Sequence, residues 1–317
     1  MKWFLSFAVA LAVAAAGLWL TTQALPPPAA PVTKEAPPVP TRSRAELLRE
    51  EPLPAPFSTL VATATPKTPP GPHDWLANQE EAGQSLADFR REAVSAKGRV
   101  VYLVPAGRLD PPHAAVVDAL GPLMRAWLQL EVKRLPPIGD EEAKVGQRQG
   151  PQGTQWFTRT LLEAALQRRP SDAAAVMALT QVDLYPDPTW NFVFGEASYE
   201  ERVGVSSLAR DGDATAERGL VLRRSFATSV HEVGHMLGLA HCIAWECAMN
   251  GSNHRDEADS RPLEPCPVCQ AKLQQAIGFD PAARWEALEG AYADAGFDDG
   301  AQAVREALGL GTADGGR

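Results

Sequence analysis

Apolar and polar positions divide the chain into an apolar opening run, a proline-rich stretch and a long region of alternating short patterns. Residues 3–20 carry no charge and follow only Met1 and Lys2. Residues 26–72 hold 14 of the 28 prolines, and a segment so rich in proline is expected to be extended and to act as a linker. We therefore expect the main folded domain to begin near residue 73.

From about residue 75 the apolar periodicity alternates between that of strands and that of helices. Short apolar runs predict strands over residues 100–104, 128–134, 175–182, 191–194 and 202–208. Helical periodicity predicts helices over residues 113–126, over 154–168 with Thr154 as N-cap, and from Gly219 onward. The last helix has an apolar face that would pack on the core, formed by Leu222, Phe226, Val230, Val233 and Leu237. The pattern predicts a mixed α+β domain over residues 73–280.

The C-terminal residues 281–317 form an acidic tail with a helical pattern. Its residues Trp285, Leu288, Tyr292, Gly296 and Ala301 have the spacing of one tetratricopeptide-like hairpin. A single repeat cannot bury its own apolar face, so a helical hairpin packed on the main domain is the favoured interpretation. If the hairpin is instead repeat-like, it would offer a surface to a protein partner.

Charge and the opening run bear on partners and location. The formal net charge of −9 argues against a nucleic-acid-binding protein. Residues 1–25 have the form of a signal peptide, and the apolar run is also long enough for a membrane anchor. Both interpretations predict an exported protein that is periplasmic, extracellular or held by a single membrane span, with no other contact with a membrane.

The candidate metal-binding residues are concentrated in the segment from His231 to His241, which reads HEVGHMLGLAH. His231 and His235 are four residues apart on a helix, so both imidazoles project from one face and can bind one cation. Gly238 can take the positive φ that ends a helix, and this lets the chain return with His241 as a third ligand. Three neutral imidazoles leave a fourth position open for water, as in catalytic zinc sites. Glu232, beside the first ligand, is placed to act as general base on that water.

A second cluster follows directly, and it contains all four cysteines of the chain: Cys242, Cys247, Cys266 and Cys269. The C-x-x-C spacing of the last two, preceded by a pair of similar span, is typical of a structural zinc site with four thiolate ligands. Two disulfides are the alternative, because an even number of cysteines behind an export signal usually forms disulfides. Met249, between the two cysteine pairs, would by itself be read as a core residue.

These motifs resemble those of the archaemetzincins, a branch of the metzincin zinc peptidases. HEVGHMLGLAHC is followed by C-A-M and C-P-V-C, and the upstream segments 183–185, 191–197 and 206–210 also resemble strands of that family. The resemblance implies a catalytic zinc on the three histidines, Glu232 as base, a second zinc on the four cysteines, and Met249 in a turn beneath the catalytic metal. It also implies a twisted mixed sheet flanked by helices, with an edge strand within 191–208 that pairs with an extended peptide.

The predicted function is therefore a zinc metallopeptidase that hydrolyses peptide bonds of peptide or protein substrates. A catalytically silent, zinc-stabilised peptide-binding or scaffold protein is one alternative, and a zinc amidase acting on another amide, such as a cell-wall peptide, is a second. Glu232 favours an enzyme over a scaffold, because a binding module needs no carboxylate beside its metal. The acidic tail and the export segment are not features of the family. Because an exported protein meets oxidising conditions, the export segment leaves open whether the four cysteines bind zinc or form disulfides.

Overall fold

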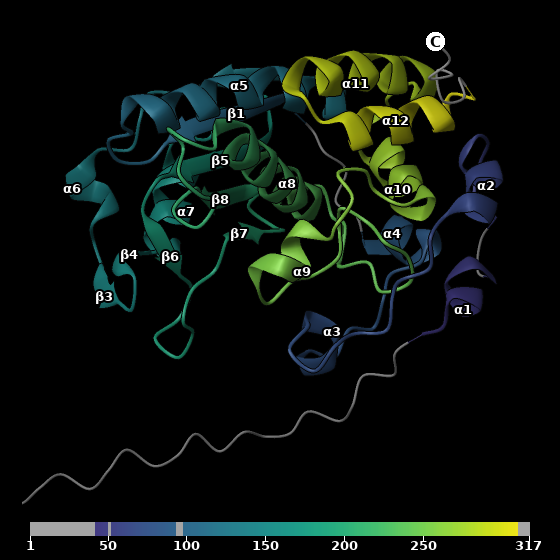
Figure 1. Cartoon of the computed structure of the whole chain (residues 1–317), viewed down its shortest axis with the longest axis horizontal. Helices are drawn as coiled ribbons and strands as arrows, with labels where there is room; N and C mark the ends of the chain where they lie inside the picture. Colours follow the sequence, from purple (N-terminus) through teal and green to yellow (C-terminus); the bar gives the residue numbers. More distant parts are fainter. Residues whose placement is uncertain (1–41, 50–51, 93–97, 310–317) are drawn as a thin grey trace, which may run out of the picture. The chain divides into compact units, whose positions relative to one another are not determined.

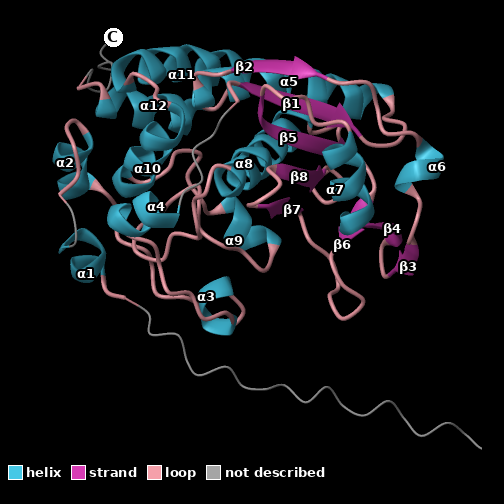
Figure 2. Cartoon of the chain, turned by 180° about the vertical axis from the view of Figure 1, so that it is seen from behind, coloured by secondary structure: helices cyan, strands magenta, loops and turns pink. Residues whose placement is uncertain are grey.

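The computed structural model describes residues 42–49, 52–92 and 98–309. Its centre is a five-stranded sheet with strand order β2-β1-β5-β8-β7 (Figure 2). The strands are β1 (Val100–Pro105), β2 (Glu131–Arg134), β5 (Ala173–Thr180), β7 (Gly195–Ser198) and β8 (Val203–Ser207). All pairs are parallel except β7 with β8, so β7 forms an antiparallel edge. A smaller sheet contains β3 (Arg148–Gly150), β4 (Gly153–Phe157) and β6 (Asp183–Tyr185).

Helices cover both faces of the central sheet because alternate strand residues are apolar on both sides. Val101 and Met177 face α5 (Pro111–Leu128) and α8 (Arg218–Met236), whereas Tyr102 and Val176 face α7 (Thr158–Gln167). Figure 1 shows α5 and α8 packed along the sheet. This is the mixed sheet with flanking helices that the sequence predicts, and the apolar face of α8 from Leu222 to Leu237 is buried as expected.

Shorter helices surround this core. They are α1 (Arg44–Arg49), α2 (Phe57–Leu60), a 3-10 turn (Val61–Thr63), α3 (Trp75–Asn78), α4 (Leu86–Glu92), α6 (Asp140–Ala143), α9 (Arg255–Asp259) and α10 (Pro267–Ile277). The C-terminal hairpin consists of α11 (Pro281–Ala295) and α12 (Asp298–Ala307), with Gly296 at φ 73° between them. It packs on the domain through Tyr292 and Phe297, whose ring centroids lie 5.9 and 6.3 Å from that of Phe226.

Three predicted elements differ from those observed. The helix expected over 154–168 begins only at Thr158, because residues 153–157 pair as a strand with β3 and β6, and Thr154 is therefore not a cap. The strand expected at 191–194 lies four residues later, as β7, and only Val193 forms a bridge, to Leu184. The strand expected from residue 128 starts at Glu131, because α5 continues to Leu128.

The described part of the predicted linker packs against the domain instead of standing apart from it. Phe57 is fully buried, with its ring centroid 6.4 Å from that of Trp285. The Lys67 N–H donates to Ala244 O, and the Glu246 N–H donates to Thr65 O. The linker prediction is therefore wrong here, because apolar residues between the prolines find partners on the core. The predicted signal or anchor over 1–25 and residues 26–41 lie outside the described residues, and no helix among those described is long and apolar enough to cross a membrane.

Candidate metal centre

The three histidines of the motif converge at the C-terminal end of α8. His231 Nε2 and His235 Nε2 lie 3.0 Å apart, because the two residues are one helical turn apart on the face next to β7. Gly238 has φ 96° and reverses the chain after the helix. His241 thereby returns to the other two, with ring centroids 5.3 Å from His231 and 4.8 Å from His235. One ring nitrogen from each histidine lies within 4.8 Å of the others.

The other ring nitrogen of each histidine is held by an acceptor. His231 Nδ1 donates to Ala248 O at 2.8 Å, and His235 Nδ1 donates to Leu239 O at 2.7 Å. His241 Nδ1 donates to Glu81 Oε1 at 2.6 Å. Since carbonyl and carboxylate oxygens only accept, each Nδ1 carries a proton, and this leaves Nε2 as the ring atom that can bind a metal.

This donor set fits zinc. Burial, followed by the charges of neighbouring histidines, lowers the pKa of His231 well below its usual value and that of His235 to about 3. Both rings are therefore neutral at physiological pH. Two unprotonated nitrogens 3.0 Å apart repel each other unless a cation lies between them, and imidazole nitrogens are ligands that zinc prefers.

Glu232 lies beside the histidines and under the edge strand. It is 7% exposed, and a Cβ atom at Gly195 of β7 would lie 2.7 Å from its Oε1. Burial raises the pKa of Glu232 to about 8, Arg261 acts in the opposite direction, and Glu196 raises it further. A divalent cation on the histidines would lower this pKa, because it favours the charged carboxylate.

Met249 lies directly beneath the histidine pair. A Cβ atom at Gly234, between His231 and His235 in the sequence, would lie 2.4 Å from Met249 Sδ. The Cys242 N–H donates to Met249 O at 2.8 Å, which links this turn to the loop that carries His241. The place of Met249 agrees with the turn that the family resemblance implies.

The four cysteines form a second buried cluster next to His241. Their sulfur atoms lie within 4.8 Å of one another, all four are free thiols, and Cys242 Sγ lies 3.8 Å from Cys266 Sγ. Backbone N–H groups of Met249 and Cys266 donate to Cys247 Sγ at 3.4 and 3.1 Å. Four sulfurs that meet at one point suit a tetrahedral zinc site, whereas two disulfides would need two bonded pairs.

A segment far from the motif completes the histidine site, and the sequence analysis missed it. Glu81 accepts from His241 Nδ1 and from Trp75 Nε1 at 2.8 Å. The Trp75 ring centroid lies 5.0 Å from that of His241. Burial acts to raise the pKa of Glu81, but its hydrogen bonds with His241 and Trp75 lower the pKa overall. We call residues 71–85 the strap. No motif marks it, because its partner His241 is 160 residues away.

A third group of metal-binding residue types, Asp74, His254 and Glu257, fastens the strap instead of forming a ligand site. His254 Nδ1 accepts from the Glu257 N–H, so its Nε2–H donates to Asp74 Oδ1 at 3.0 Å. Both Glu257 oxygens accept from the Trp75 N–H, at 2.9 and 3.0 Å. Both ring nitrogens of His254 are therefore engaged in hydrogen bonds that hold the strap.

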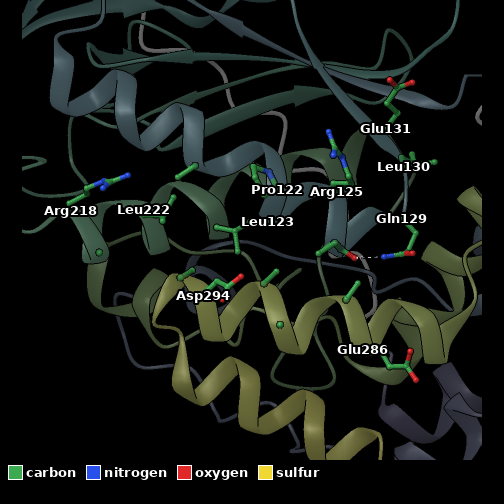
Figure 3. Close-up of a pocket in the computed structure, with 17 residues that line it drawn as sticks. Pro122, Leu123, Arg125, Gln129, Leu130, Glu131, Arg218, Leu222, Glu286 and Asp294 are labelled. Carbon is green, nitrogen blue, oxygen red and sulfur yellow. Dashed lines mark hydrogen bonds between the residues drawn. The ribbon is translucent and has the colours of Figure 1, made fainter.

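A cleft of about 590 Å³ opens above the histidines. Its walls are the segment 186–194, β7, the end of α8, residues 252–253 and the strap residue Trp75. Trp190 and Tyr199 at its rim are 41% and 47% exposed, and Tyr199 Oη lies 2.8 Å from His235 Nδ1. A larger hollow of about 1370 Å³ lies between α5 and α11 (Figure 3), but none of the candidate ligands lines it.

Comparison with known proteins identifies a peptidase family. The model of Peptidase family M54 matches residues 172–275. Archaemetzincin-2 of Mus musculus is 33% identical over 259 residues, which cover 68% of this chain and 71% of that protein. Archaemetzincin-2 of Homo sapiens is 32% identical and covers 70% of this chain and 73% of that protein.

Solved structures are also similar. The archaemetzincin of Methanopyrus kandleri is 30% identical and covers 58% of this chain and 97% of its own, with a TM-score of 0.49. That of Archaeoglobus fulgidus, solved in complex with malonate, is 27% identical and covers 55% of this chain and 99% of its own, with a TM-score of 0.45. From the sequence relatives we conclude that the chain belongs to the archaemetzincin family and is a zinc-dependent metallopeptidase.

Proposed function

We propose that this chain hydrolyses peptide bonds in the cleft above α8, with zinc held by His231, His235 and His241 and with Glu232 as general base. The observation that carries the proposal is the meeting of three imidazoles, each anchored through Nδ1, beside a buried carboxylate. Zinc bound there would act as a Lewis acid toward the scissile carbonyl and water. Glu232 takes the proton of the attacking water and passes it to the departing amine.

The substrate backbone would lie along β7. This strand pairs only with β8 among the described strands, so its outer edge can accept an extended peptide as a further strand. Gly195 and Glu196 of this strand line the cleft above Glu232. An extended peptide paired here passes directly over the histidines.

Cleavage assays on two kinds of amide test the substrate class. Zinc-loaded protein is incubated with a diverse peptide library and, separately, with cell-wall peptides, and the products are identified by mass spectrometry. We expect cuts between ordinary amino acids in the library. Cleavage of cell-wall peptides alone would support the amidase alternative, and cleavage of neither would support the silent scaffold.

We also propose that the four cysteines hold a second, structural zinc and that the domain works outside the cytoplasmic membrane. The converging free thiols support the zinc, and the apolar run at 3–20 supports export. A protein partner at the C-terminal hairpin stays a prediction. Tyr292 and Leu288, on the apolar face of α11, are fully buried against the domain, so a partner would have to contact other residues.

Replacing Gly195 with alanine is expected to lower kcat on the order of 100-fold, because the new methyl group would displace the Glu232 carboxylate by a fraction of an ångström or more. Zinc content should not change, since no histidine is touched. Gly121→Ala in α5 is the matched control, because its added methyl group meets no atom within 4 Å. Full kcat in Gly195→Ala would contradict the close approach of β7 to the base.

Replacing Glu81 with glutamine is expected to weaken zinc binding at the histidine site by about 10- to 100-fold, because the charged acceptor that fixes the His241 ring is lost. Competition with a chelating dye measures this affinity. Glu246→Gln is the control: Glu246 binds Lys67 and the Thr68 N–H just before the strap but does not touch a histidine. Equal losses in both variants would mean that Glu81 matters only for holding the chain in place.

A further inference from the structure

Arg261 is a buried cation in the wall of the cleft that forms no ion pair with any carboxylate in the described part of the chain. It is 7% exposed. Its Nε donates to Ala258 O at 3.3 Å, and its Nη1 donates to Asn250 O at 2.9 Å. Nη1 also lies 3.1 Å from His231 Nδ1, whose proton is already given to Ala248 O. The second terminal nitrogen, Nη2, has no hydrogen-bond partner among the residues that the structure places.

Neighbouring arginines differ from Arg261 because each has its own carboxylate. Arg255 pairs with Asp211, Arg224 with Asp259 and Arg210 with Asp183. An arginine guanidinium stays charged at neutral pH. A charge taken out of water without a counter-ion is costly, and it is retained most readily where a ligand supplies the opposite charge.

Two residues with hydroxyl groups, Thr228 and Ser252, line the same cleft as Arg261, and we call the part of the cleft that these three residues line the corner. Thr228 is one helical turn before His231 on α8, and Ser252 is two residues after Asn250, whose carbonyl holds Arg261. Both residues line the cleft together with Arg261. Neither hydroxyl has a partner among the described residues. The corner therefore presents a planar guanidinium edge and two hydroxyl donors, which is the donor pattern that suits a carboxylate.

The acids of the cleft do not satisfy this corner. Asp187 and Glu196 belong to the wall formed by residues 186–198, and Asp187 Oδ1 already accepts from the Thr189 N–H and hydroxyl. Glu232 is the acid whose charge acts most strongly on Arg261, but it lies beyond ion-pair distance and serves as base in the proposed function. Since no carboxylate among the described residues lies within ion-pair distance of Arg261, a carboxylate of the substrate can supply the anion.

We propose that Arg261, Thr228 and Ser252 form a carboxylate-binding subsite that selects peptides with an acidic group close to the cleaved bond. The group is either an aspartate or glutamate side chain or the free C-terminal carboxylate of the peptide. This inference rests on the proposed function, because it assigns a substrate class to the same cleft.

Matched blocked peptides test the subsite. One set carries aspartate or asparagine at each position around the cleaved bond, and a second set ends in a free carboxylate or an amide. For zinc-loaded wild-type protein we expect kcat/KM at one position to favour the charged member about 10- to 100-fold. The set that shows the preference tells a side-chain carboxylate from a C-terminal one.

Variants show which residues cause the preference for the charged peptide. Arg261→Gln should remove it, and Arg261→Lys should keep part of it, because lysine supplies the charge without the planar pair of donors. Since Arg261 also holds two backbone carbonyls, the double variant Thr228→Val/Ser252→Ala is a second test, with an expected several-fold loss of the preference. Arg134→Gln, on the opposite edge strand β2, is the control and should keep the full preference. Zinc content is measured in every variant to show that the site is intact.

Binding is measured separately from turnover, with zinc-loaded Glu232→Gln and the same peptide pairs. A Kd that is about tenfold lower for the charged member, and that becomes equal for both members when Arg261→Gln is added, supports the subsite. Equal Kd and equal kcat/KM for charged and uncharged members would overturn it, and so would a preference that survives Arg261→Gln. If wild-type protein cleaves no peptide, the proposed function fails, while the Kd values still decide whether the subsite exists.

Discussion

Replacing Glu232 with alanine is expected to abolish peptide hydrolysis while the zinc at the histidines remains bound. Glu232 makes no contact that a ligand histidine needs, because the three Nδ1 atoms are held by Ala248, Leu239 and Glu81. General bases contribute about 10²- to 10⁴-fold to rates, so kcat should fall by at least a hundredfold. Rates on a cleaved library peptide and zinc content by elemental analysis measure the two effects.

The stability of the metal-free protein provides the control for folding. The folded-state pKa of Glu232, about 8, lies above its ordinary value of 4.5, so the folded state disfavours the ionised carboxylate. The stabilising contribution of this group is complete below pH ~4.5 and is lost as the pH rises toward 8. Metal-free Glu232→Ala should therefore melt no lower than metal-free wild-type protein at pH 8. A much lower melting temperature would mean that lost activity reflects lost structure.

Replacing Cys266 with serine is expected to remove one zinc per chain and to destabilise the whole domain. Cys266 is 4% exposed, its sulfur faces that of Cys242, and Cys242 is adjacent to His241. Structural zinc sites contribute on the order of 10 kcal/mol to folding, so losing a ligand should lower the melting temperature sharply. Removing one thiolate also frees the loop that delivers His241, and we therefore expect weaker zinc binding at the histidines as well.

Metal analysis, thermal unfolding and intact mass test this second prediction. Ser260→Ala is a suitable control, because Ser260 lies between the two cysteine pairs and, among the described residues, its hydroxyl donates only to Glu257 O. A native mass that is four hydrogens lower, which corresponds to two disulfides, would contradict the zinc site. Zinc content equal to that of the wild type in Cys266→Ser would contradict it as well.

Local patterns in the sequence predicted the parts of the fold and site that depend on nearby residues. The apolar face of α8 and the four-residue spacing of His231 and His235 together place two ligands on one side of a buried helix. Gly238 has the positive φ that its place after the helix suggests. The C-x-x-C spacing likewise predicted that the thiols converge.

Contacts between distant segments could not be predicted in this way. Residues 153–157 have a helical pattern, yet they form a strand because β3 and β6 lie on either side of them. The strap begins where the predicted proline-rich linker ends, and nothing in its sequence indicates that it contacts His241. Only the folded chain shows that Glu81 accepts a hydrogen bond from His241 Nδ1. Arg261 is one arginine among many in the sequence, and its lack of a carboxylate partner becomes visible only when its neighbours are placed.

The most direct test of the account is a zinc titration of peptide cleavage by the full chain. The protein is first stripped of metal with a chelator under reducing conditions, zinc is then added in steps, and cleavage of a library peptide is followed beside the count of bound zinc. We predict no cleavage without metal and activity that rises to a plateau as the histidine site fills. Protein with full zinc that cleaves no peptide, or cleavage that persists without metal, would contradict the account.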